Sequence, residues 1–294
     1  MSKVLIVTDS AAAIEPEVAG ELGVTIVPIT VRISSRDGRK EEVYQDGINL
    51  NSEELLLRMA SERVHLSIIG PTAAQFRRIY GELTRQSDQI ISLHSSASLS
   101  LVCREAERAA REFMGRCDIA VMDSETLSLG LRILVEEAAR LANTSVPMIE
   151  IMRQVRGLIP RIYIVCVTET LDYLERSRLI SPAQAVLGTM LGIRPFLAIE
   201  EGRIIPMEKA RSRERALDKL IEFVGEFSHI ERIAILRSNA AHTEDVRVLR
   251  ERLESLLPGK EFPVVPYGPL LASHIGPDGI GLVVYEGQGR RVMS

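Results

Sequence analysis

Short apolar runs alternate with segments of helical period along the first half of the chain. The strand-like runs are KVLIVT (3–8), VTIVPITVRI (24–33), DQIISL (88–93) and CDIAVMDS (117–124). Helix-like stretches separate them, at 16–23, 52–62, 72–86, 99–114 and 127–142. Strands that alternate with helices predict a parallel sheet with helices on both faces. We therefore expect an α/β protein whose N-terminal part is a largely parallel, Rossmann-like sheet.

The second half of the chain has a different pattern. A helix-like segment at 148–159 precedes the strand-like run IYIVCVT (162–168), and IRPFLAIEEGRIIPME (193–208) is typical of two strands that turn at Glu201-Gly202. Further strands are expected over 232–238 and 262–268, and helices over 183–191, 210–227 and 244–257, before a Gly-rich tail. We predict two domains, 1–157 and 158–294, the second a mixed α/β domain.

Composition narrows the class of protein. The 294 residues suffice for two domains, and 36 basic against 40 acidic residues argue against a general nucleic-acid binder. No apolar stretch approaches the roughly 18 residues that span a bilayer, and the apolar run in MSKVLIVTDS is too short for a signal peptide. Three widely spaced cysteines without a CxxC pair indicate reduced thiols rather than zinc ligands. We expect a cytoplasmic protein with no membrane span and no metal site.

Three of the predicted strands end alike, in Asp9-Ser10, Ser95-Ser96 and Asp123-Ser124. The carboxyl ends of parallel strands lie along one edge of a sheet, where ligands bind. Hydroxyls and helix N-termini at that edge suit a carboxylate or a phosphate. Each serine could instead cap a helix. Because SSASLS (95–100) places four serines before one helix, we predict that Ser96 or Ser100 binds a ligand.

The pattern also leaves an enzyme open. His274 lies in ASHIGPDGIG, a Gly-rich turn that permits close backbone approach to a ligand. A serine-dependent acyl or phosphoryl hydrolase would use Ser100 or Ser96 as nucleophile, His274 as base, and Asp9 or Asp123 to orient it. However, the chain has no GxSxG elbow, and no GxxxxGK[ST], GxGxxG or HExxH motif.

Basic residues recur in YLERSRLIS, which contains Arg176 and Arg178. These arginines are either a solvated helix face or a docking patch for an acidic partner. Both interpretations stay open at this point.

Taken together, the motifs resemble the DegV family of bacterial fatty-acid-binding proteins. The resemblance covers nearly the whole chain, in order. Seven segments carry it: VTDSAAAI, SIIGPTAAQF, HSSASLSLVCREA, VMDSETLSLG, TLDYLERSRLISPAQA, LGIRPFLAIEEGRIIPMEKARS and SHIGPDGIGL.

The resemblance implies that a long-chain fatty acid lies in a tunnel between two α/β domains, with its carboxylate held by hydroxyls and a histidine. Ser96 and Ser100 match serines of the family's SSxLSGT segment, His274 matches its terminal His, and Ser10 belongs to its TDS turn. The resemblance also implies that the loaded protein presents the carboxylate to a separate fatty-acid kinase.

The chain departs from the family pattern at three places. Ile68 stands at the family's Thr, with Ser67 and Thr72 as the nearest hydroxyls. Leu101 follows Ser100 where the family has Gly, and Leu179 stands where the family has the arginine of its Gly-Gly-Arg element. We assign Ser67 and Thr72 a supporting role at the carboxylate.

We therefore predict a carrier without chemistry of its own, whose ligand is a fatty acid and which needs no cofactor. Two alternatives remain: the serine hydrolase, and a regulatory interaction protein whose cavity is vestigial.

Overall fold

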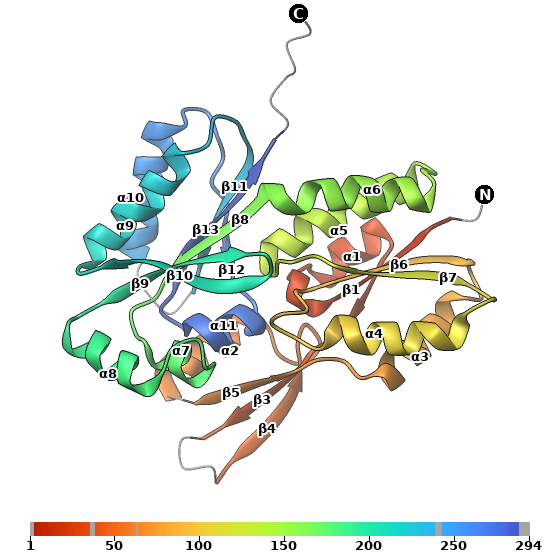
Figure 1. Ribbon diagram of the computed structural model, residues 1–294, viewed down its shortest axis with the longest axis horizontal. Coiled ribbons are helices and arrows are strands. Elements are labelled where there is room, and N and C mark those ends of the chain that lie inside the picture. The colour runs from red at the N-terminus through yellow and green to blue at the C-terminus, as the bar shows by residue number, and fades with distance from the viewer. Residues whose placement is uncertain (1–2, 36–38, 63, 239–242, 288–294) are drawn as a thin grey trace, which may run out of the picture.

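The computed structural model describes residues 3–35, 39–62, 64–238 and 243–287. Its first domain contains a parallel sheet in the order β2-β1-β6-β7, which lies on the right in Figure 1. The strands are β1 (Leu5–Asp9), β2 (Val24–Val27), β6 (Gln89–His94) and β7 (Asp118–Asp123). The order reverses between β1 and β6, so the ends of these two strands meet at the topological switch point. The predicted parallel sheet is confirmed.

Helices cover both faces of this sheet, because its strands are apolar on both sides. On one face lie α1 (Pro16–Leu22), α5 (Ser128–Asn143) and α6 (Met148–Leu158), and on the other α3 (Ala73–Leu83) and α4 (Val102–Ala110) (Figure 1). Successive side chains of β1 point to opposite faces of the sheet. Ile6 packs in the core with α5, whereas Val7 packs with α3 and α4.

The second domain contains a mixed six-stranded sheet in the order β10-β9-β8-β13-β11-β12. Its strands are β8 (Ile162–Val167), β9 (Arg194–Glu200), β10 (Arg203–Ala210), β11 (Ile230–Arg237), β12 (Val264–Pro266) and β13 (Ile280–Glu286). One face is covered by α9 (Arg213–Gly225) and α10 (Thr243–Leu256), and the other faces the first domain. Glu201 and Gly202 both have positive φ angles, which confirms the predicted tight turn between β9 and β10.

Two expectations were wrong. Residues 24–33 do not form one strand, because β2 ends before Pro28. The next strand, β3 (Thr30–Ser34), belongs to a different sheet. There β3 pairs antiparallel with β4 (Glu41–Gln45) and β5 (His65–Ile69), and α2 (Ser52–Glu62) connects β4 to β5. The Gly-rich tail contains a helix and an inner strand, α11 (Pro269–Ile275) and β13. Position 281 of β13 must be a glycine, because a Cβ there would lie 2.4 Å from the Val165 carbonyl oxygen of the neighbouring strand β8.

The predicted domain boundary at residue 157 falls at the end of α6, between the parallel sheet and β8. It stays a prediction, because one apolar core runs across it. The short helices α7 (Asp172–Arg176) and α8 (Pro182–Met190) follow β8, and α11 packs against α7 and β5. Three single 3-10 turns complete the described elements, at Ser10–Ala12, Arg111–Phe113 and Ile159–Arg161. Over the described residues, no helix is long and apolar enough to cross a membrane.

Candidate ligand-binding site

The serine loop, residues 95–101, joins β6 to α4 at the carboxyl edge of the parallel sheet. Ser96 is fully buried there, and its hydroxyl donates to the Gly202 carbonyl oxygen at 2.6 Å. The Ser96 hydroxyl oxygen also accepts the Ser98 N–H at 3.1 Å. Ser96 therefore ties the serine loop to the β9–β10 turn of the other domain, and both of these bonds occupy the hydroxyl that we predicted to bind a ligand.

Ser95 and Ser100 are the other inward hydroxyls of the loop. Their Oγ atoms lie 3.4 Å apart, at the long limit of a hydrogen bond, and Ser100 is half-buried. Leu101 occupies the N-cap position of α4 and offers no capping side chain. The Ser100 hydroxyl accepts the N–H of Val102, the first residue of α4, at 3.4 Å and lies 3.5 Å from the Ser96 carbonyl oxygen. Both distances are at the long limit of a hydrogen bond, so a ligand that offers a shorter bond can compete for this hydroxyl.

Asp9 holds the serine loop from beneath. Its carboxylate accepts the Ser95 N–H at 2.9 Å and lies 3.1 Å from His94 Nδ1. The other ring nitrogen of His94 lies 2.7 Å from Ser92 Oγ, which accepts from the Tyr80 hydroxyl at 2.8 Å. The four side chains of this hydrogen-bonded chain, Asp9, His94, Ser92 and Tyr80, are fully buried. They therefore anchor the serine loop from inside the protein and do not contact solvent.

His274 lies in α11 with Nδ1 buried and without a partner among the described residues. Burial lowers the pKa of His274 to about 4, so its imidazole is neutral at pH 7. Helix α11 packs on β5, and Gly70, just after β5, approaches Val102 at the start of α4. The helix that carries His274 therefore packs on β5, and the residue after that strand lies near the start of α4, which follows the serine loop.

The two predicted supporting hydroxyls are placed less favourably. Thr72 caps α3: its Oγ1 donates to Gln75 Oε1 at 2.9 Å, and Thr72 is exposed. Ser67 is exposed on β5, on the opposite face from Ile68. Ile68 packs against the interdomain core, so the residue that departs from the family pattern extends an apolar surface.

Ser10 lies apart from the serine loop. Its hydroxyl accepts the Ile29 N–H at 3.0 Å and bonds to the Asp46 carboxyl. Burial raises the pKa of Asp46 to about 7. Both residues lie in the wall of a cavity of about 850 Å³ between β2, the start of α2 and β12.

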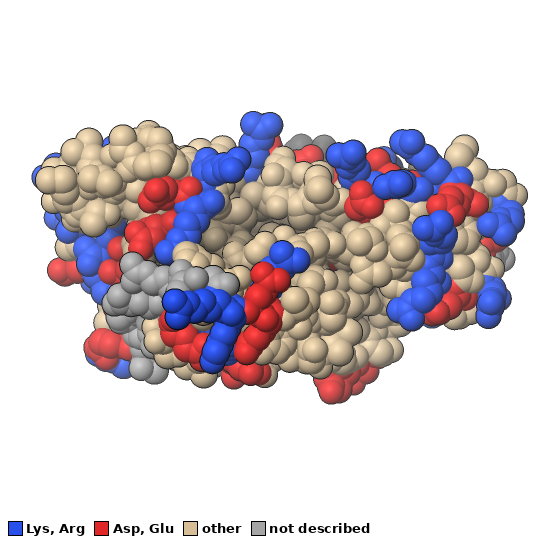
Figure 2. All heavy atoms as spheres, turned by 90° about the horizontal axis from the view of Figure 1, so that it is seen from below, with Lys and Arg blue, Asp and Glu red and all other residues tan. Residues whose placement is uncertain are grey.

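Arg176 and Arg178 line a shallow groove of about 540 Å³ beside α7 and α8. The Arg176 guanidinium lies over the Tyr173 ring, 5.4 Å from its centroid. On the face that Figure 2 shows, Lys and Arg side chains are intermixed with Asp and Glu. That face therefore presents individual charges of both signs rather than a patch of one sign.

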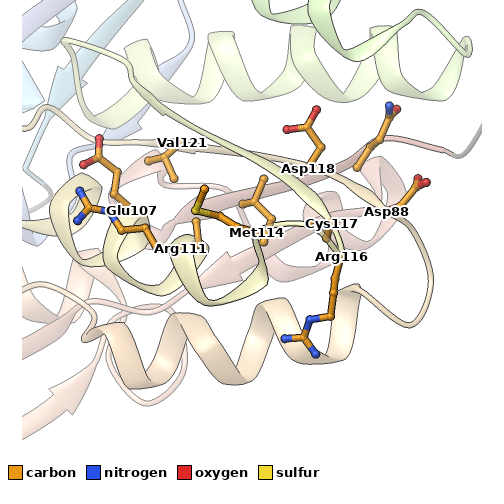
Figure 3. A pocket seen from close by; sticks show the side chains of 12 residues that line it. Asp88, Glu107, Arg111, Met114, Arg116, Cys117, Asp118 and Val121 are labelled. Atoms are coloured by element: carbon orange, nitrogen blue, oxygen red, sulfur yellow. The ribbon is translucent and has the colours of Figure 1, made fainter.

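A further cavity of about 690 Å³ lies at the opposite edge of the parallel sheet. Figure 3 shows that its side chains come from α4, from the segment after it, and from the first residues of β6 and β7. Asp88, Arg116 and Asp118 are among them. This cavity is at the amino ends of the strands, away from the edge where the serine loop lies.

The arrangement does not assemble the hydrolase that the sequence left open. Asp9 is committed to Ser95 and His94, and the Asp123 carboxylate accepts the N–H groups of Ala97 and Glu125. In the described part of the chain no carboxylate contacts His274 Nδ1. His274 is therefore not a base oriented by a carboxylate, and the histidine that Asp9 does orient, His94, contacts the fully buried Ser92 rather than Ser96 or Ser100.

The sequence analysis did not single out three buried hydroxyls near the carboxyl edge of the parallel sheet. Thr8, Thr126 and Ser128 are at most 4% exposed, and within the described residues their side-chain oxygens have no hydrogen-bond partner. The signal was present in KVLIVT and DSETLSLG, where polar residues interrupt apolar patterns. Short polar side chains at strand and helix ends are so common as caps that the pattern alone did not single them out.

Comparisons with known proteins agree on one family. A family model described as "Uncharacterised protein, DegV family" matches residues 3–287. A DegV domain-containing protein of Deinococcus radiodurans is 30% identical over 284 residues, which are 96% of this chain and 98% of the relative.

Solved structures give the same result. A DegV family protein of Thermus thermophilus, described by its fatty acid binding, superposes with a TM-score of 0.81 at 28% identity, over 97% of this chain and 100% of its own. A stearic-acid-binding protein of Eubacterium ventriosum has the same TM-score at 22% identity, over 97% and 98% of the two chains. The second similarity supports the fold alone.

Proposed function

The chain belongs to the DegV family, and from this premise we propose that it binds a long-chain fatty acid between its domains and presents the carboxylate to a fatty-acid kinase. The relative from Thermus thermophilus, described by its fatty acid binding, supports the ligand class. We propose no catalytic step for this chain. Its predicted cytoplasmic location and the absence of a cofactor stay predictions.

One observation supports the proposal most strongly: the serine loop adjoins an apolar core that both domains share. That core contains Leu93 and Leu127 of the first domain together with Ile164 and Leu197 of the second. An acyl chain placed between them would gain about 0.8 kcal/mol for each buried CH₂ group. The polar loop at its edge would then meet the carboxylate.

We propose Ser100 and His274 as the principal carboxylate donors. A neutral imidazole can donate one N–H, and a hydroxyl can donate one O–H, to an anion. Ser96 could donate to the carboxylate only if its hydroxyl gave up the bond to Gly202. The weaker candidates are Ser67, which is exposed, Thr72, which caps α3, and Ser10, whose hydroxyl bonds to Ile29 and Asp46.

A double variant, Ser100→Ala with His274→Ala, tests the assignment. We expect it to retain little of the fatty acid that copurifies with the unchanged protein, as measured by mass spectrometry of a solvent extract. Each hydrogen bond to a charged group contributes about 1.5–3 kcal/mol, so losing two should weaken binding at least a hundredfold. Ser98→Ala, at an exposed serine of the same loop, is the control. Equal lipid content in the double variant and the control would refute the assignment.

The kinase docking residues have a separate test. Charge reversal in Arg176→Glu with Arg178→Glu should slow phosphorylation of the bound acid by a fatty-acid kinase, with unchanged lipid content. Arg153→Glu with Arg156→Glu, at two exposed arginines on α6, serves as the charge-matched control. Phosphorylation at the unchanged rate in the docking variant would remove these arginines from the proposed interface.

A further inference from the structure

The cavity of about 850 Å³ beside the start of α2 plays no part in the proposed function, and its lining does not include the serine loop. Its size falls within the range of about 300–1,000 Å³ that is usual for small-molecule sites. Both domains form its wall, since α1, β2 and the first turn of α2 belong to the first domain, whereas Val265 and Pro266 belong to β12 of the second. Apolar side chains make up most of the wall, among them Ile14, Ile26 and Leu50. The cavity therefore has the size and the apolar surface of a ligand site.

The charged side chains that line this cavity are all acidic: Glu15, Asp46, Glu53 and Glu54. Glu15 is already paired with Arg132, at 2.8 Å. Glu53 and Glu54 are exposed in the first turn of α2, where they offset the positive end of the helix dipole. Over the described residues, no Lys or Arg lines the cavity. Its charges thus favour a cation over an anion.

Asp46 distinguishes the cavity from an acidic surface. It is only 6% exposed, and it accepts a hydrogen bond from Ser10, whose own oxygen accepts the Ile29 N–H. Burial, and after it the nearby Asp9 carboxylate, raise the pKa of Asp46, and no cation of the described chain acts on it. A buried carboxylate normally has a cationic partner, because an ionised group is costly to remove from water. Since Asp46 lies in the wall of a cavity, a ligand can supply that partner.

We propose that this cavity is a second ligand site, for a small organic cation whose ammonium or amidinium group pairs with Asp46 and whose apolar body packs on the cavity wall. The site is separate from the one proposed for the fatty acid. Backbone bonds hold its carboxylate in place: the Asp46 N–H donates to the Ile29 carbonyl oxygen and the Gly47 N–H to that of Leu50, both at 3.0 Å. Because hydrogen bonds between ions are stronger than those between neutral groups, the site should reject an uncharged analogue.

Titration calorimetry with the protein as purified provides the test, since any copurified lipid then stays in place. The probes are phenethylamine, hexylamine and benzamidine, which stay protonated at pH 8, and their uncharged analogues 2-phenylethanol, 1-hexanol and benzamide. We expect at least one cation to bind about ten or more times tighter than its analogue at pH 8. Its affinity should fall about tenfold at pH 6, because Asp46, with a pKa of about 7, takes up a proton over that range. If no cation binds tighter than its analogue, the proposal is wrong.

Two variants locate the site. Asp46→Asn removes the charge at nearly constant size, so it should abolish both the preference for the cation and its pH dependence. Val265→Phe adds a ring to the wall from β12, where Val265 is half-buried, and should weaken binding of the cation at least about tenfold. Asp88→Asn, at an exposed carboxylate on the opposite edge of the parallel sheet, should bind the cation like the unchanged protein.

The fatty acid that copurifies with these variants separates the two sites. Asp46→Asn and Val265→Phe should both retain it. Equal binding of the cation by Asp46→Asn and Asp88→Asn would place the cation elsewhere and overturn the proposal. Loss of the fatty acid in both cavity variants would show that the cavity belongs to the acyl site, which overturns a separate cation site but leaves the proposed function standing.

Discussion

At the scale of single residues, the polar side chains at the sheet edge divide into those that hold the backbone and those that remain free. Asp9 and Ser96 use their oxygens on Ser95, His94 and Gly202, so their role is to position the serine loop. The sequence could place all of them at one edge, because strand ends of a parallel sheet meet there. It could not tell which hydroxyls the protein itself would occupy, since Ser96 bonds to a residue far along the chain.

Asp46 gives a residue-scale prediction about pH. Its pKa rises from 3.8 in the unfolded chain to about 7, so the folded protein holds a proton that the unfolded chain has released. The free energy of unfolding should therefore fall as pH rises from about 4 to 7, by about 4 kcal/mol in total. Asp46→Asn removes this contribution, and denaturant titrations at pH 5 and pH 8 should show a smaller loss of stability than in the unchanged protein.

Two comparisons isolate that effect. His274 acts in the opposite direction, because its lowered pKa removes stability as pH falls below 6.5, but it is present in both proteins. Asp88→Asn, the same substitution at an exposed carboxylate, is the matched control. If Asp46→Asn and the unchanged protein lose equal stability between pH 5 and pH 8, Asp46 does not carry the buried proton.

At the scale of elements, the β9–β10 hairpin is the piece of the second domain that reaches the serine loop. Its turn was predictable from EEG, because Glu201 and Gly202 adopt the positive φ angles that such turns require. Its contact with Ser96 was not predictable, since local sequence says nothing about distant partners. The break at Pro28 and the inner strand around Gly281 were missed for related reasons: both depend on which strand lies alongside.

Gly202→Ala tests this hairpin contact. The added Cβ would lie 2.3 Å from Ser96 Oγ and 3.3 Å from the Glu125 Cα, at a φ angle of +74°. We expect a loss of about 2–4 kcal/mol in the free energy of unfolding, from the strained φ angle and the displaced Ser96 together. Gly259→Ala is the matched control, because its φ angle is +81° and no atom lies within 4 Å of the added Cβ. An equal loss in both variants would show that only backbone strain matters and that the hairpin contact is dispensable.

At the scale of the whole molecule, the two domains share one apolar core, with the serine loop and the His274 helix near its edge. The α/β class, the parallel first sheet and the mixed second sheet followed from the alternation of apolar runs. The small antiparallel sheet did not, because β3, β4 and β5 are short, and β4 has largely exposed side chains. The continuity of the core across the domains also escapes local patterns, yet it supports the proposed ligand most.

The central claim is tested most directly by mass spectrometry of the solvent extract from protein purified out of a bacterial host. We predict about one fatty acid for each protein chain. An empty extract, together with no uptake from a panel of palmitic, stearic, oleic and hydroxystearic acids, would contradict the account. The shared core would then be packing alone, and the chain would be an interaction protein with a vestigial site.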